Sequence, residues 1–162
     1  MRAGILSASA LIPAIHKDGN SQGSASLQVI SEAGTWWLEY PEAEFHAVKQ
    51  PLRISLGLNT FGEEGISLQV ERNRLSLHGE LRHGPLNPLQ SDIMGPFRFI
   101  SELECTHGVV SMGHRLEGTL TLNDETLDFS GGSGYIETDR GRSFPDKYLW
   151  TQCNWGKPET PG

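Results

Sequence analysis

The sequence predicts an all-β fold, an antiparallel barrel or sandwich of about nine or ten short strands with little helix. Apolar residues recur at every second position in several segments, and this spacing buries one face of an antiparallel sheet while the other stays in water. Gly, Pro, Asn and Asp gather between these segments, where the chain must turn. Glycine supplies 19 of the 162 residues, above the usual share of about 7%, which agrees with many turns.

The alternating segments can be followed in chain order. They lie at residues 8–15, 26–30, 35–40, 52–58, 66–70, 75–81 and 116–122. The turns expected between strands lie at 32–34, 59–62, 72–73, 123–124 and 131–132. Trp36 and Trp37 are consecutive, so on a strand their rings face opposite sides. We expect one ring in the core and the other in a pocket or edge contact.

The stretch from His83 to Pro96 breaks this rhythm with three prolines and two glycines. It is expected to be a long loop with room for one helical turn. Loops of more than about 12 residues are uncommon unless they are functional. Two interpretations stay open: the segment covers a pocket, or it is a surface crossover between two sheets.

Length and charge exclude several classes of protein. The chain fits one domain, at roughly 100–200 residues per domain, which we place at 1–155 with a flexible tail at 156–162. A net charge of −7 without a basic stripe argues against nucleic-acid binding. No apolar run reaches about 18 residues, so no transmembrane segment is expected. Ser7 and Ser9 interrupt the apolar run that a signal peptide needs, so we expect a cytoplasmic protein rather than an exported one.

The residues that bind metals and cofactors form no strong pattern. Cys105 and His107 are spaced as potential ligands, with His114 nearby, but the second close pair of a structural zinc site is missing. We therefore expect no metal, and no cofactor, since no glycine-rich phosphate loop precedes a helix. Cys105 and Cys153 are expected to be free thiols, with one disulfide between them as the alternative. The isolated histidines His46, His78 and His83 are expected in solvent.

The most informative segment is 131–154. If its first part is extended, Tyr135, Glu137 and Asp139 share one face of the strand, because side chains alternate. In a second extended part, Trp150, Gln152 and Asn154 share a face. Aromatic rings with polar tips suit a partly apolar ligand pocket. The two carboxylates could equally form a structural ion-pair network with Arg140 and Arg142, and the residues alone leave both interpretations open.

The same segment resembles a known family. The runs Gly134-Tyr135-Ile136-Glu137-Thr138-Asp139-Arg140-Gly141, Ser143-Phe144-Pro145 and Trp150-Thr151-Gln152-Cys153-Asn154 resemble the motif of the tocopherol cyclase-like family. Upstream, Asp92-Ile93-Met94-Gly95-Pro96-Phe97, Cys105-Thr106-His107 and Ser111-Met112-Gly113-His114 are similar to its bacterial members. The likeness covers roughly residues 10–155 and corresponds to the N-terminal half of the family's usual length. Arg140 departs from the pattern, since many members have an aromatic residue there.

The resemblance implies a lipocalin-like β fold and a reaction. Plant members of the family close the chromanol ring of vitamin E from a prenylated hydroquinone. This chemistry needs a neutral carboxylic acid in a dry site to protonate an alkene, and burial can raise a carboxyl pKa by about 3–5 units. The resemblance makes Glu137 the expected acid and Asp139 an arginine-paired organiser of the site.

The remaining motif residues are expected to bind substrate. Tyr135 and Trp150 would face the carbocation that forms when the alkene is protonated. Aromatic faces stabilise cations by about 1–2 kcal/mol each when desolvated. The other expected substrate-binding residues are His114, Arg140, Arg142, Phe144, Gln152 and Asn154. The alternatives are a non-catalytic binder of an apolar small molecule and a β domain whose motif only holds the fold. A homodimer and contact with a membrane surface are further expectations for a half-length domain with an apolar ligand.

Overall fold

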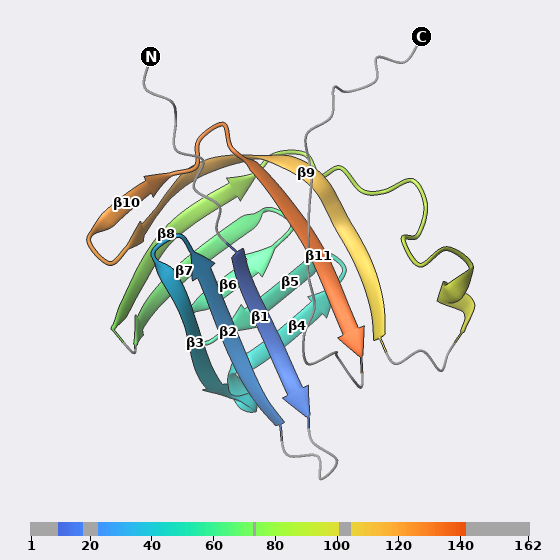
Figure 1. The fold of residues 1–162 in the computed structure, drawn as a ribbon, viewed down its shortest axis with the longest axis horizontal. Coiled ribbons are helices and arrows are strands. Elements are labelled where there is room, and N and C mark those ends of the chain that lie inside the picture. Colours follow the sequence, from blue (N-terminus) through green and yellow to red (C-terminus); the bar gives the residue numbers. More distant parts are fainter. Residues whose placement is uncertain (1–9, 18–22, 73, 101–104, 142–162) are drawn as a thin grey trace. The chain divides into compact units, whose positions relative to one another are not determined.

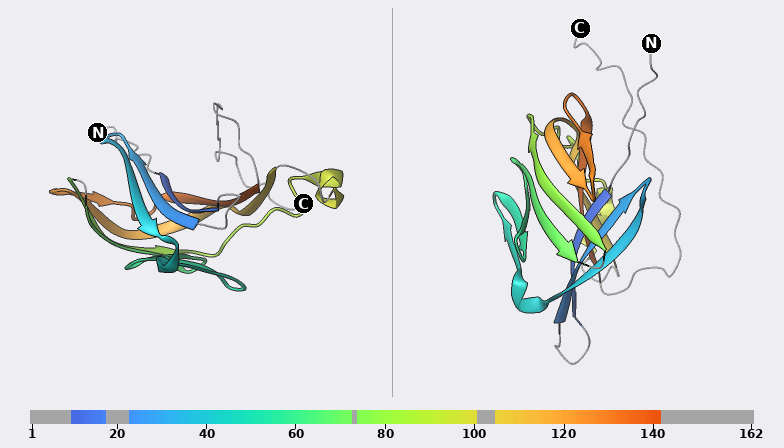
Figure 2. Two further views of the ribbon diagram at one scale, coloured as in Figure 1. Left: turned by 90° about the horizontal axis from the view of Figure 1, so that it is seen from below. Right: turned by 90° about the vertical axis from the view of Figure 1, so that its left-hand side faces the viewer.

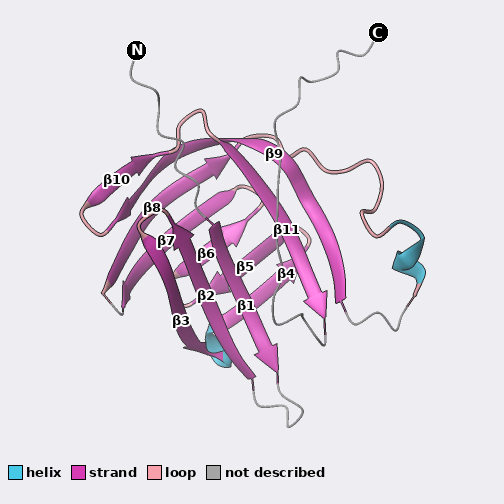
Figure 3. Cartoon of the chain, viewed as in Figure 1, coloured by secondary structure: helices cyan, strands magenta, loops and turns pink. Residues whose placement is uncertain are grey.

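The computed structural model describes residues 10–17, 23–72, 74–100 and 105–141 (Figure 1). In these residues it confirms the all-β prediction, with eleven strands and two short 3-10 helices (Figure 3). The strands are β1 (Ala10–Lys17), β2 (Gly23–Ser31), β3 (Gly34–Pro41), β4 (Phe45–Lys49), β5 (Leu52–Leu56), β6 (Asn59–Gly62), β7 (Gly65–Arg72), β8 (Leu75–His83), β9 (Cys105–Leu122), β10 (Glu125–Asp128) and β11 (Ser133–Gly141). The 3-10 helices are η1 (Glu42–Glu44) and η2 (Gly95–Phe99).

The described residues group into two compact units, each built from two stretches of chain. The first takes the described residues up to 82 together with 117–130, and the second takes the described residues of 83–116 together with 131–141. Strand β9 contributes to both units. The expectation of a single domain over 1–155 stays a prediction.

The first unit is a sandwich of antiparallel strands that does not close into a barrel in the described part of the chain. Its smaller sheet has the order β1-β2-β3, and its larger sheet runs from β4 through β8 and continues to β9 and β10. Figure 2 shows the hairpin of β2 and β3 and the strands β5 to β8 as separate layers. The sandwich alternative of the prediction is therefore the one the structure adopts.

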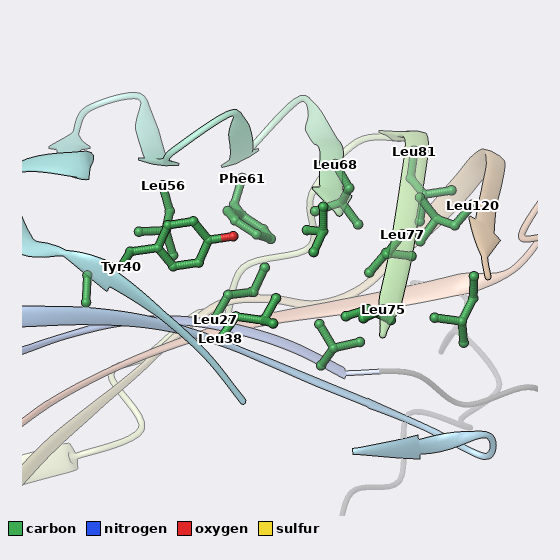
Figure 4. Close-up of a cluster of buried hydrophobic side chains, with 14 residues drawn as sticks. Leu27, Leu38, Tyr40, Leu56, Phe61, Leu68, Leu75, Leu77, Leu81 and Leu120 are labelled. Carbon is green, nitrogen blue, oxygen red and sulfur yellow. The ribbon is translucent and has the colours of Figure 1, made fainter. Parts of the chain in front are cut away.

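Leucines from both sheets fill the space between the layers (Figure 4). Leu27 and Leu38 lie opposite each other on β2 and β3, and both are fully buried. Leu56 and Leu68 extend from the larger sheet into the same cluster. Burying one such side chain contributes about 1.5–3 kcal/mol relative to an exposed position, so the period-2 stripes explain why these two sheets face each other.

The predicted turn at 59–62 is wrong, because these residues form strand β6. The turn comes earlier, where Gly57 adopts a φ of 59° that favours glycine. Leu58 lies in that turn and is 70% exposed, although it continues the apolar stripe of β5. Asn59 is buried instead, and its side chain fixes the start of β6.

The Asn59 amide joins three strands of the first unit. Its Nδ2 donates to the Leu56 carbonyl at 3.0 Å and to the Tyr40 hydroxyl at 3.3 Å. Its Oδ1 accepts from the backbone N–H of Gln69 at 2.9 Å. A buried polar group costs stability unless it is hydrogen-bonded. Both the nitrogen and the oxygen of the Asn59 side chain are hydrogen-bonded.

The paired tryptophans behave as the alternation predicts. Trp36 is half-buried and packs against the core cluster. Trp37 is 50% exposed, and its ring centroid lies 5.9 Å from that of His16. One ring is thus a core contact and the other an edge contact of the β1–β3 sheet.

In the second unit, β9 and β11 lie side by side as an antiparallel ribbon (Figure 1). The register is irregular between Gly134 and Ile136 and between Ile136 and Glu137, where β9 uses one more residue than β11 each time. Such bulges redirect side chains and increase the local twist. The alternation of apolar residues along the chain does not indicate these bulges.

The segment between β8 and β9 is fastened to this ribbon. The Gly84 N–H donates to the Arg115 carbonyl at 2.8 Å, and the Met112 N–H donates to the Asn87 carbonyl at 2.8 Å. The prediction of a long loop after His83 is confirmed, but the helical turn η2 begins only at Gly95 and continues beyond the predicted stretch to Phe99. In the described residues we find no helix with the length and apolar character to span a bilayer.

Candidate functional site

The polar face of β11 starts with a hydrogen-bonded pair. The Tyr135 hydroxyl donates to Oε2 of Glu137 at 2.8 Å, which agrees with the expectation that these alternate residues share a face. Tyr135 is half-buried, whereas Glu137 is exposed. Desolvation, followed by the hydrogen bond and charge of Glu137, raises the pKa of Tyr135 to about 12. The phenol therefore stays protonated at neutral pH and acts as a donor.

Strand β9 adds a second pair beside the first. His107 lies opposite Asp139 in the register, and its Nδ1 is 2.7 Å from the Asp139 Oδ1. On the far side of the same imidazole, Nε2 lies 3.5 Å from Sγ of Cys105. We call Tyr135, Glu137, Asp139, His107 and Cys105 the ribbon row.

The partner of Asp139 differs from the sequence expectation. In the described part of the chain Asp139 pairs with His107, and Arg140 makes no ion pair. Arg140 alternates to the opposite face, and its carbonyl accepts a hydrogen bond from the Thr106 hydroxyl at 3.1 Å. The sequence drew attention to Cys105 and His107 as metal-type residues, but their position opposite Asp139 depends on the strand register, which the sequence does not reveal.

His114 does not join the ribbon row. It is 5% exposed, and its Nδ1 lies 3.0 Å from the Ser111 hydroxyl, which also accepts the Asn87 N–H at 3.0 Å. Desolvation and then the charge of His83 lower the pKa of His114 to about 4. His114 is thus a neutral side chain at pH 7 that helps to fasten the 84–100 segment to β9.

The prediction that His83 lies in solvent is wrong. The side chain is half-buried, and its ring centroid lies 4.4 Å from that of His114. The reason is tertiary: Gly84, next in the chain, is hydrogen-bonded to Arg115 of β9. This bond places His83 beside the ribbon.

Five predicted site residues lie outside the described residues. They are Arg142, Phe144, Trp150, Gln152 and Asn154. Cys153 lies outside them as well, while Cys105 carries a free thiol, as expected for an unpaired cysteine.

Neither of two depressions found in the surface is lined by the ribbon row. The first measures about 470 Å³ and lies over β7 and β8, and the second measures about 430 Å³ and lies by the turn between these strands. In the part of the chain that is described, no group of three or more His, Cys, Asp and Glu residues is placed to hold a metal ion. The ribbon row therefore offers hydrogen-bond donors, carboxylates and a thiol on a partly open face.

Comparison with known proteins adds no assignment. No protein-family model matches the chain, and neither curated proteins nor solved structures gave a match.

Proposed function

We propose that this chain is a tocopherol cyclase-like domain that binds the hydroxylated ring of a prenylated hydroquinone, or of a similar amphipathic phenol, at the ribbon row. One observation carries the proposal: two hydrogen-bonded pairs, Tyr135–Glu137 and His107–Asp139, lie next to each other on one face of the ribbon. The motif resemblance points to three of these residues, Tyr135, Glu137 and Asp139.

The chemistry of the two pairs suits a ring with two hydroxyl groups. Each pair contains a carboxylate, which has several acceptor sites and can accept from a phenol hydroxyl while it also accepts from its own partner. Glu137 and Asp139 are two residues apart on a strand, hence about 6.6 Å apart along it. This spacing is comparable to the span of an aromatic ring, so both hydroxyls can be bound at once.

Acid-catalysed ring closure is the second candidate, and the desolvation of Tyr135 beside Glu137 favours it. A carboxyl group must be neutral to protonate an alkene, and removal of water raises its pKa. Glu137 is exposed in the free chain, so this reaction requires the bound prenyl chain to cover it. In this case Glu137 is the acid and the Asp139–His107 pair binds the ring.

A prenylated ligand partitions into lipid, so a cytoplasmic protein that binds it would take it up at a membrane surface. We propose this peripheral contact together with the binding function.

The test is a calorimetric titration of the protein with a short-chain prenylated hydroquinone, followed by chromatography of the mixture. We expect binding by the wild type and a loss of about tenfold, or roughly 1.4 kcal/mol, in each of Glu137→Gln and Asp139→Asn. The matched control is Glu125→Gln on exposed β10, which should bind normally. Binding without a cyclised product supports the binder, and a product that Glu137→Gln abolishes supports the cyclase. Equal affinity in all variants, or no binding, overturns the proposal.

A further inference from the structure

Three side chains of the ribbon row stand in the order thiol, imidazole, carboxylate. Cys105 Sγ lies 3.5 Å from His107 Nε2, and His107 Nδ1 lies 2.7 Å from Asp139 Oδ1. A nucleophile within reach of a base that is oriented by a third group is the general arrangement of activated nucleophiles. The half-buried Cys105 is adjacent to the exposed His107 and Asp139, so small molecules can reach the group.

The carboxylate fixes which imidazole nitrogen carries the proton. An ionised carboxylate only accepts hydrogen bonds, so the contact with Asp139 requires the proton of neutral His107 to sit on Nδ1. Nε2 is then left with its lone pair directed toward Cys105. This is the tautomer that a general base needs.

The thiol itself is not activated at rest. Desolvation first, and the charge of Asp139 second, raise the pKa of Cys105. A preformed thiolate is therefore disfavoured, and a reaction at this sulfur needs a base that removes the proton as the new bond forms. His107 is the base that the geometry supplies.

We propose that Cys105 is a nucleophile that His107 deprotonates and Asp139 positions, and that it adds to soft carbon electrophiles of the α,β-unsaturated carbonyl class. In the step, the Cys105 proton passes to Nε2 of His107 while sulfur bonds to the β-carbon. The electrons of the C=C bond move to the α-carbon, which then takes the proton from His107. The product is a thioether, and the imidazole returns to its starting state without an oxidant or a leaving group.

The experiment measures the rate at which acrylamide alkylates the full chain, with the labelled peptide identified by mass spectrometry so that Cys105 is read separately from Cys153. We expect His107→Gln to slow labelling of Cys105 by about tenfold or more. General bases in enzymes accelerate reactions by about 10²–10⁴-fold, so a tenfold loss is the smallest effect that the proposal predicts. The matched control is His46→Gln, an exposed histidine on β4, which should keep the wild-type rate. Circular dichroism checks that each variant is folded.

Asp139→Asn distinguishes the positioning of His107 by Asp139 from a direct effect of the Asp139 charge on Cys105. The two roles predict opposite changes in the alkylation rate. If Asp139 acted only through its charge, which raises the pKa of Cys105, its removal would speed alkylation. If it holds the His107 tautomer, its removal slows alkylation. The proposal predicts the slower rate.

The pH profile is the second measurement. The carboxylates on the His107 side of β11 are Asp139 and, one position further, Glu137, while Arg140 lies on the other face. The His107→Gln rate should rise only as the Cys105 thiol itself ionises, and burial raises the pKa of that thiol. The wild-type rate should therefore exceed the His107→Gln rate most clearly at a pH below the pKa of Cys105. A His107→Gln rate equal to that of His46→Gln, or an Asp139→Asn rate at or above wild type, overturns the proposal.

Discussion

His114 is expected from the sequence to bind substrate, but it is buried between β9 and the segment that follows β8. Its folded-state pKa of about 4 lies below the ordinary histidine value of 6.5. The unfolded chain therefore takes up a proton first as the pH falls, and the folded state loses stability between pH 6.5 and 4. The pKa difference between 6.5 and about 4 limits this loss of stability to about 3–4 kcal/mol.

We predict that the free energy of unfolding, measured with urea, falls in this pH window and that His114→Gln removes most of that dependence. Exposed His78 provides the control, since His78→Gln should leave the dependence in place. An equal loss of stability in wild type and His114→Gln would contradict the assignment of this proton to His114.

The Asn59 side chain makes a second prediction for a single residue. Asn59→Ala leaves the Gln69 N–H without its acceptor and removes both bonds donated by Nδ2. An unsatisfied buried donor costs about 1–3 kcal/mol, so we expect a loss of about 3 kcal/mol by thermal or urea unfolding. Tyr40→Phe removes only one of the three bonds and should cost about 1 kcal/mol. Equal losses in the two variants would show that the amide does not join the strands.

At the scale of elements, the contact between β11 and β9 depends on a glycine. A Cβ atom at Gly134 would clash with His114 Nε2, and would lie 2.8 Å from His114 Cε1 and 2.9 Å from Leu116 Cδ2. Gly134→Ala is therefore expected to cost about 1–3 kcal/mol through overpacking. Gly113→Ala is the matched control, because its Cβ would meet only Ser133 Oγ at an ordinary 3.7 Å. Thermal unfolding of both variants checks the prediction, and equal melting temperatures would refute it.

The strands that alternate cleanly could be predicted from the sequence, and the exceptions have local causes. The stripes at 66–70 and 75–81 correspond to β7 and β8, because every second residue in them is apolar. Strand β6 was missed because Asn59 looks like a turn residue, and only its three hydrogen bonds explain its burial.

The candidate site was predictable in part. The shared face of Tyr135 and Glu137 follows from strand alternation alone, and their hydrogen bond agrees with it. The pairing of His107 with Asp139 could not be foreseen, since it joins residues 32 positions apart through a register that contains two bulges. Short-range patterns do not encode such a register.

At the scale of the whole molecule, the strands that end the sheets bear on association. In the described part of the chain, β1 ends the smaller sheet and β4 ends the larger one. Val48 on β4 is 54% exposed, and an open strand edge is a template for pairing with another chain. We predict a dimer of twice the chain mass by sedimentation velocity, and a Val48→Lys variant with a larger monomer fraction. A monomer across the micromolar range would contradict this.

The hydroxyl groups of the ring are the part of the ligand that the ribbon row is proposed to bind. The most direct measurement compares the affinity of the protein for a short-chain prenylated hydroquinone with its affinity for the dimethyl ether of the same compound. The ether keeps the prenyl chain and ring but cannot donate to Glu137 and Asp139. We predict that the ether binds at least about tenfold more weakly, since a hydrogen bond to a charged group contributes about 1.5–3 kcal/mol. Equal affinities for the two compounds would contradict the account.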